Sequence, residues 1–247
     1  MKDYFSRQAS IYAKFRPTYP DALYDEIVKH VDDKGVAWDC GTGNGQVAQG
    51  LAKHFNSVYA TDISLDQLSH AIYNRKVQYL QFPAEETPFA DDTFDLITAG
   101  QALHWFDIEK YYEEVKRVGK DNSLFACWGY NFPIAQNEEI QQLLTEFTNT
   151  LHEYFPPERQ MVDEKYETIP FPFEEIKVSE SFQIEKKWMT EELCGYLNSW
   201  SAVQRYKDQH KENPVDKLYE QLESSETATA TVSLVFPIFI RIGKIKK

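Results

Sequence analysis

Three glycines at alternate positions, Gly41, Gly43 and Gly45, constrain this chain more than any other feature. They follow a short apolar run that ends near Asp39, and residues that suit a helix come after them. This order predicts a strand, a tight turn and the start of a helix. Glycine adopts positive φ and lets the backbone approach a ligand that a Cβ would repel. The turn therefore predicts a site for a nucleotide-like ligand.

The spacing of the glycines separates this turn from a dinucleotide site. A dinucleotide-binding turn has the pattern G-x-G-x-x-G, with the pyrophosphate over the helix N-terminus. Here the third glycine comes one residue too early, and Asp39 precedes Gly41 by two residues. A carboxylate there suits a cationic or hydrogen-bond-donating ligand better than a phosphate, which it would repel. Two alternatives stay open: an NAD-dependent oxidoreductase, and a glycine-rich loop without a ligand.

Length and composition indicate one globular domain. The 247 residues can bury a large core, and they favour a single domain over two domains that each have a large core of their own. Because no signal-peptide pattern or membrane-length apolar run is seen, we expect a cytoplasmic protein without a membrane span. Three widely spaced cysteines favour free thiols, and we expect no metal site. The net charge of −13 argues against a nucleic-acid partner.

Strand-like and helical segments alternate through the first half of the chain. We expect a first strand that begins at residue 36 and further strands at 57–61, 77–82, 94–99 and 123–128. Helices are expected at 46–55, 64–73 and 107–118. This alternation predicts a doubly wound parallel sheet with right-handed crossovers. The second half is expected to hold helices at 138–154, 190–206 and 215–222 and strands at 182–188 and 232–242, with a bulge or restart at Pro237.

Three polar residues stand at predicted element boundaries. Asp62 ends the second strand, 17 residues after Gly45, where a carboxylate can accept both ribose hydroxyls of an adenosine. Helix capping alone is the alternative for Asp62. Asp21 is expected to cap the helix before the first strand. Ser64 followed by Gln67 has the pattern of a capping box.

The D-x-G-x-G-x-G run, together with Asp62, resembles motif I of the class I S-adenosylmethionine (SAM) dependent methyltransferases. The resemblance implies SAM as the cofactor and a Rossmann-like α/β fold: a doubly wound, seven-stranded, mostly parallel sheet whose last strand is antiparallel beside the fifth. Inserted helices at about 136–170 and 190–222 would form a lid over the carboxyl ends of the strands, where ligands of open α/β sheets bind. We divide the single domain into cofactor-covering helices (1–34), a SAM-binding core (35–130), a lid and acceptor region (131–228) and a closing strand (229–247).

Further segments resemble the same family. The acidic segment at residues 83–89 implies Ala84 and Glu85 as adenine contacts, with solvated loop acids as the alternative. The segment after the fourth strand lies where the family places the methionine end of SAM, which implies Gln101 as a contact of its amino group. Residues 6–20 resemble the leading segment of the small-molecule, trans-aconitate methyltransferase-like subfamily, which folds over the cofactor. Arg16 could pair there with a carboxylate, or form a surface salt bridge instead.

These observations give a predicted site. The cofactor-binding set is Tyr12, Arg16, Asp39, Gly41, Gly43, Gly45, Asp62, Ile63, Ala84, Glu85 and Gln101, and the acceptor-binding set is Tyr19, His104, Trp105, Trp128 and Trp200. Most aromatic side chains of the second half could equally be core residues, and a lone histidine is more often structural than catalytic. We therefore nominate no general base and keep His104 as the candidate if one is needed.

The resulting hypothesis is a SAM-dependent methyltransferase that moves a methyl group to a small-molecule acceptor. The subfamily resemblance suggests a carboxylate, which is already ionised near neutral pH and needs no base. The alternatives are a non-catalytic SAM-binding regulator or partner subunit, and an NAD-dependent oxidoreductase. We expect a monomer or a homodimer.

Overall fold

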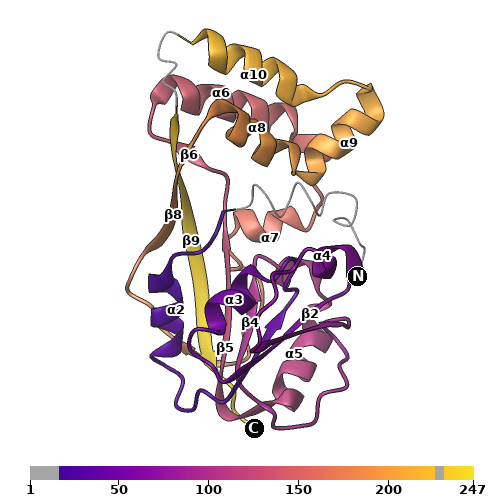
Figure 1. The fold of residues 1–247 in the computed structure, drawn as a ribbon, viewed down its shortest axis with the longest axis vertical. Coiled ribbons are helices and arrows are strands. Elements are labelled where there is room, and N and C mark those ends of the chain that lie inside the picture. The colour runs from indigo at the N-terminus through magenta and orange to yellow at the C-terminus, as the bar shows by residue number, and fades with distance from the viewer. Residues whose placement is uncertain (1–16, 226–230) are drawn as a thin grey trace.

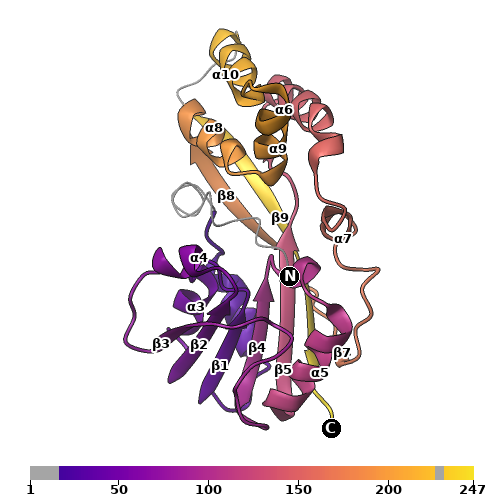
Figure 2. The same cartoon turned by 90° about the vertical axis from the view of Figure 1, so that its right-hand side faces the viewer.

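The computed structural model describes residues 17–225 and 231–247. A core of sheet and helices lies below a group of lid helices, α6, α8, α9 and α10 (Figure 1). A ribbon formed by two strands, β8 and β9, rises from the core to the lid (Figure 2). The carboxyl ends of the parallel strands point toward the lid, which is where ligands of open α/β sheets bind.

One sheet contains all nine strands of the described residues. They are β1 (Val36–Cys40), β2 (Ser57–Asp62), β3 (Val77–Gln81), β4 (Phe94–Gly100), β5 (Gly119–Tyr130), β6 (Ile134–Ala135), β7 (Glu174–Ile176), β8 (Phe182–Trp188) and β9 (Val232–Lys244). The main path runs β3-β2-β1-β4-β5-β9-β6, with β1 to β5 parallel and β9 antiparallel to β5. The predicted doubly wound sheet, with an antiparallel last strand beside the fifth, is confirmed.

Strand β9 connects the core with the lid. Its lower part pairs with β5 and β7, and its upper part pairs with β6 and β8. The strand runs on through Pro237, so the expected bulge or restart within it is wrong. Tyr130 pairs with Ile238 whereas Ile134 pairs with Val235, and Pro237 falls in the gap between these two ladders. A missing N–H is tolerated at such a point.

The helices follow the predicted order, but most of those in the core are shorter than expected, the segment expected at 190–206 is divided into α8 and α9, and α7 was not predicted. They are α2 (Asp21–Val28), α3 (Gln46–Leu51), α4 (Leu65–Ser69), α5 (Ile108–Val118), α6 (Glu138–Thr150), α7 (Arg159–Asp163), α8 (Thr190–Asn198), α9 (Ser201–His210) and α10 (Pro214–Ser224), with 3-10 turns η2 (Leu103–Trp105) and η3 (His152–Tyr154). The predicted cap at Asp21 is wrong. Pro20 takes the N-cap position without a side-chain bond, and the Asp21 carboxylate pairs with Lys53 Nζ at 2.6 Å.

Separate apolar clusters cover the two faces of the sheet and fill the lid. Trp38, Phe94 and Tyr111 belong to the cluster against α5, whereas Leu23 and Leu51 belong to the cluster against α2 and α3. The lid has a cluster of its own, which includes Phe147, Leu193, Trp200, Leu218 and Phe236. The lid is therefore a packed unit as well as a cover. Cys40, Cys127 and Cys194 are buried free thiols, as the sequence predicts.

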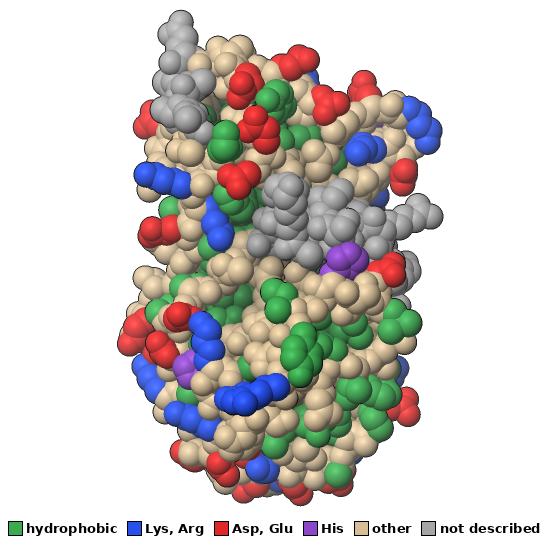
Figure 3. Space-filling view, in the orientation of Figure 1, with side chains coloured by type: hydrophobic (Ala, Val, Ile, Leu, Met, Phe, Trp, Pro, Cys, Tyr) green, Lys and Arg blue, Asp and Glu red, His purple; other side chains and the backbone are tan. Residues whose placement is uncertain are grey.

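The surface carries charges of both signs. On the face seen in Figure 3, Lys and Arg side chains are interspersed with Asp and Glu. No helix in the described part of the chain is long and apolar enough to cross a membrane.

Candidate functional site

The glycine turn joins β1 to α3, and its three glycines have positive φ values of 66°, 56° and 86°. Two of them are required by the protein's own packing. A Cβ on Gly41 would lie 2.7 Å from the Cβ of Ala102, and one on Gly45 would overlap the ring of Tyr79. A Cβ on Gly43 would meet nothing closer than Gln67 Oε1, at 3.7 Å. Gly43 is thus the member of the three whose Cα leaves space for a ligand.

Asp39 supports the turn from inside the protein. Its side chain is 1% exposed, and its carboxylate accepts hydrogen bonds from the hydroxyl groups of Thr42 and Thr98. Burial raises the pKa of Asp39 to about 7, although both hydroxyl groups act in the opposite direction. The carboxylate is therefore committed to the turn rather than presented at its surface. Direct contact with a cofactor stays a prediction.

Asp62 joins the end of β2 to the glycine turn. Its Oδ2 accepts the Gly43 N–H at 2.8 Å, and its Oδ1 accepts the Ser64 N–H at 2.9 Å. Hydrogen bonds from backbone N–H groups to a carboxylate are among the stronger ones. They fix the orientation of the carboxylate at the point where the sequence predicts ribose binding.

The predicted capping box at α4 forms only in part. Ser64 Oγ accepts the Gln67 N–H at 3.3 Å, but the Ser64 N–H is taken by Asp62. The Gln67 side chain is 3% exposed, and its Oε1 has no hydrogen-bond partner among the described residues. This acceptor atom lies beside Gly43. The sequence analysis missed Gln67 because its capping pattern already explained it.

Two predicted cofactor contacts are occupied by other parts of the chain. Glu85 Oε1 accepts the Asp107 N–H at 2.9 Å, so this carboxylate is held at the start of α5. The Gln101 amide bonds both backbone groups of Tyr130: its Oε1 accepts the N–H at 2.7 Å, and its Nε2 donates to the carbonyl at 3.2 Å. A contact between either side chain and SAM would have to compete with these bonds. Two further predicted cofactor contacts are Ala84 and Ile63. The Ala84 side chain is 2% exposed. The Ile63 carbonyl accepts a hydrogen bond from Gln81 Nε2.

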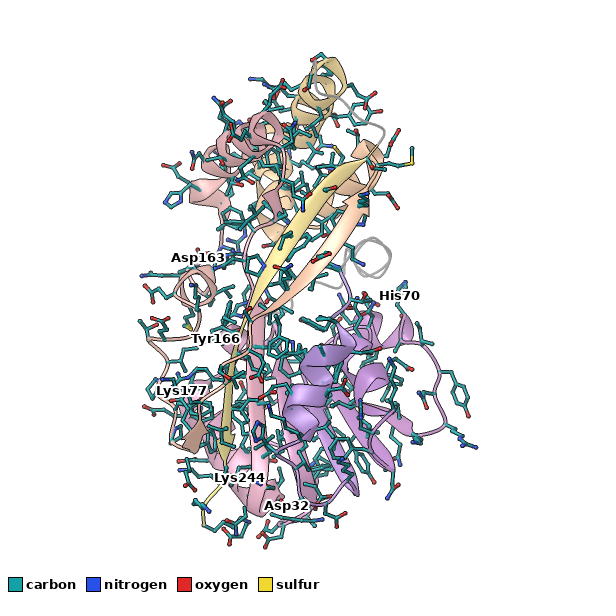
Figure 4. The ribbon with its side chains drawn as sticks, turned by 90° about the vertical axis from the view of Figure 1, so that its left-hand side faces the viewer. Asp32, His70, Asp163, Tyr166, Lys177 and Lys244 are labelled. Carbon is teal, nitrogen blue, oxygen red and sulfur yellow. The ribbon has the colours of Figure 1, made fainter. Side chains whose placement is uncertain are left out.

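His104 lies in η2 after β4 and is 5% exposed. Its Nδ1 is 2.8 Å from the hydroxyl of Tyr166, which is fully buried. Burial raises the pKa of Tyr166 well above its ordinary value, so the hydroxyl stays protonated. Figure 4 shows Tyr166 on the core side of Asp163, which ends α7. The pair therefore links the end of β4 to the segment that follows α7.

A cavity lies where the ends of β4 and β5 meet the lid. Its volume is about 70 Å³, and its lining is Gln101, His104, Trp105, Tyr130, Asn131, Phe155, Pro156, Arg159, Val162, Tyr196, Trp200 and Ser201. Three of the five predicted acceptor residues, His104, Trp105 and Trp200, thus meet around one space. The sequence analysis missed Arg159, because it follows a proline-rich connection and belongs to no periodic pattern.

The other predicted acceptor residues do not line this cavity. Trp128 is fully buried in the sheet cluster, which favours the core alternative for it, and its role in acceptor binding stays a prediction. Tyr19 packs edge-on against Trp128, with 5.6 Å between ring centroids, and also against Tyr130. Tyr12 and Arg16 lie outside the described residues.

Comparisons with known proteins agree with this geometry. A family model described as "Methyltransferase domain" matches residues 38–127. A candidate methyltransferase of Dictyostelium discoideum is 30% identical over 98% of this chain and 95% of its own length. A probable SAM-dependent methyltransferase of Saccharomyces cerevisiae is 25% identical, but the match spans about half of that protein (51%). The solved structure of a candidate type II methyltransferase from Anaeromyxobacter dehalogenans is 33% identical, with a TM-score of 0.85 over 94% of this chain and 99% of that one.

Proposed function

Because this chain belongs to the SAM-dependent methyltransferase family, we propose that it methylates a small-molecule acceptor held between the sheet and the lid. The observation that carries the proposal is the cavity at the ends of β4 and β5. Residues of the core, such as Trp105, and of the lid, such as Trp200, line it together. Its volume of about 70 Å³ lies below the roughly 300 Å³ of a pocket for a drug-sized ligand, so the space as it stands favours a small acceptor.

The residues of the glycine turn fit SAM. Gly43 leaves room for a ligand, and Gln67 Oε1 is an acceptor without a partner in the described chain beside it. SAM carries hydrogen-bond donors, two ribose hydroxyls and an ammonium group, that suit such an acceptor. We assign Asp62 to the ribose hydroxyls and Ile63 and Ala84 to the neighbourhood of the adenine. When bound, SAM would supply the methyl group on its sulfonium sulfur. The leaving group of the transfer is S-adenosylhomocysteine, a neutral thioether.

The protein's own task is then to hold the acceptor in line and to exclude water. Trp105, Tyr196 and Trp200 give the cavity aromatic walls, and aromatic faces favour a sulfonium cation nearby. Alignment of two reactants can supply about 7 to 11 kcal/mol of the barrier reduction in well-oriented cases. We propose a carboxylic acid as the acceptor class, since its carboxylate is ionised near neutral pH and needs no general base. His104, bonded to Tyr166, is then a positioning residue.

The test has two steps. Calorimetric titration of the full chain should show binding of SAM and of S-adenosylhomocysteine, and no binding of NADH. Methyl transfer from radiolabelled SAM is then screened over small acids, amines and lipids, and we expect label in the acids. Transfer only to lipids or amines would overturn the carboxylate proposal. Tight SAM binding with no transfer to any small molecule would overturn the acceptor site itself.

A further inference from the structure

Helix α7 brings one cation into the acceptor cavity, and this inference rests on the proposed function of that cavity. Among the described residues that line it, Arg159 is the one Arg or Lys, and there is no Asp or Glu. The chain as a whole has 39 acidic residues against 26 basic ones. A lining that excludes carboxylates in so acidic a protein favours an anionic occupant over a cationic one.

The hydrogen bonds of Arg159 hold the guanidinium in place and leave one end of it available. Its Nε and Nη2 each lie 2.9 Å from Oδ1 of Asp163, and Nη2 also donates to Asn131 Oδ1 at 3.2 Å. The guanidinium carbon lies 3.9 Å from the ring centroid of Phe132, which stacks against it. Nη1 carries two N–H donors and has no partner among the described residues. A planar, pre-oriented guanidinium of this kind is suited to bind a carboxylate.

The charge of Arg159 is only partly offset by its partner. The Arg159 side chain is 18% exposed, whereas that of Asp163 is 49% exposed and therefore well screened by water. The net charge of −13 repels anions at long range. At contact distance inside a cavity, a single nearby cation outweighs that diffuse field because Coulomb energy falls with distance.

We propose that Arg159 binds a carboxylate of the methyl acceptor through Nη1, and so selects organic anions over neutral acceptors. The cavity volume of about 70 Å³ is several times the roughly 10 to 15 Å³ that a cavity needs to hold one water. This space favours a carboxylate on a short carbon chain, with Trp105 and Trp200 among the residues around it. Acceptor specificity thus comes from a residue on the short helix α7.

The test compares an acid with its isosteric amide. Crotonate and crotonamide are titrated into the full chain saturated with S-adenosylhomocysteine, and dissociation constants are measured by saturation-transfer-difference NMR. We expect the wild-type protein to bind crotonate at least tenfold more tightly than crotonamide. Arg159→Gln should weaken crotonate binding tenfold or more and leave crotonamide within twofold. Arg159→Lys keeps the positive charge but lacks the planar guanidinium. Its dissociation constant for crotonate should lie between those of the wild-type protein and Arg159→Gln. Arg75→Gln makes the same charge change at an exposed loop residue and should alter neither constant.

SAM binding to each variant is measured in parallel by calorimetry, which also shows whether the variant is folded. Crotonate binding that is equal to crotonamide binding, absent, or unchanged by both Arg159 substitutions would overturn the inference while leaving SAM binding intact. Failure of the wild-type protein to bind SAM would instead overturn the proposed function.

Discussion

The core and the lid build their halves of the site in different ways. In the core, the features that we assign to the cofactor come from one short stretch: the left-handed turn at Gly43 and the Asp62 carboxylate that accepts its N–H. Around the acceptor cavity, the features are side chains such as Phe155, Arg159 and Trp200, which the segment before and at the start of α7 and the junction of α8 and α9 bring together. A site made from one turn tolerates change elsewhere, whereas a site made by packing depends on the whole lid. Substitutions should therefore separate cofactor binding from acceptor binding.

Trp200→Ala should give the largest effect on stability. Trp200 is 6% exposed, and its ring centroid lies 4.9 Å from Phe132 and 5.8 Å from Phe155. Loss of a buried tryptophan should lower the free energy of unfolding by about 3 to 5 kcal/mol in urea titrations. SAM affinity of the folded protein should stay within twofold, and Trp200→Phe should cost less stability. A large loss of SAM affinity in Trp200→Phe would contradict the expectation that cofactor binding is independent of the residues around the acceptor cavity.

Asp39→Asn should change how stability depends on pH. The pKa of Asp39 is raised from 3.8 to about 7 in the fold, so the fold favours the protonated carboxyl. Its stabilising contribution is fully present below the unfolded pKa and is lost as pH rises through the folded one. Between pH 5 and pH 8 the wild-type protein should lose about 2 to 3 kcal/mol from this group, and Asp39→Asn should not. Urea titrations at both pH values measure this, and parallel curves for the two proteins would refute it.

Gly45→Ala and Gly43→Ala should differ in their effects on stability. Each imposes a left-handed conformation on alanine, which costs about 1 to 2 kcal/mol. At Gly45 the new Cβ also overlaps the ring of Tyr79, whereas at Gly43 it has space. Thermal unfolding should therefore show the lower melting temperature for Gly45→Ala. Equal melting temperatures would show that Tyr79 yields to the new Cβ.

Gln67→Leu should have the smallest effect. Removal of a buried acceptor without a partner in the described chain should leave the stability of the SAM-free protein unchanged or slightly higher. SAM affinity should fall roughly three- to tenfold, which corresponds to one ordinary hydrogen bond. A SAM titration with unchanged affinity would remove Gln67 from the site.

Local signals predicted the glycine turn to which we assign the cofactor. Alternate glycines, an apolar run and Asp62 fix the turn within a short stretch of sequence, and the alternation of strands and helices fixes the order of the sheet. Non-local partners explain the differences. Glu85 bonds a backbone 22 residues away, and Gln101 bonds one 29 residues away, which no sequence pattern reveals. Strands β6 and β7 have two and three residues, too few to show an alternation. Arg159 enters the cavity only through the packing of α7.

The most direct measurement is a calorimetric SAM titration of Asp62→Ala beside Asp66→Ala. Asp66 is an exposed residue of the next helix, α4, and provides the same chemical change away from the turn. Asp62→Ala removes two charge-assisted bonds that hold the turn, together with the proposed ribose contact. We expect SAM affinity to fall about 100-fold in Asp62→Ala, or roughly 2.7 kcal/mol, and to stay within twofold in Asp66→Ala. Equal SAM affinity in Asp62→Ala and the wild-type protein would contradict the assignment of the glycine turn as the cofactor site.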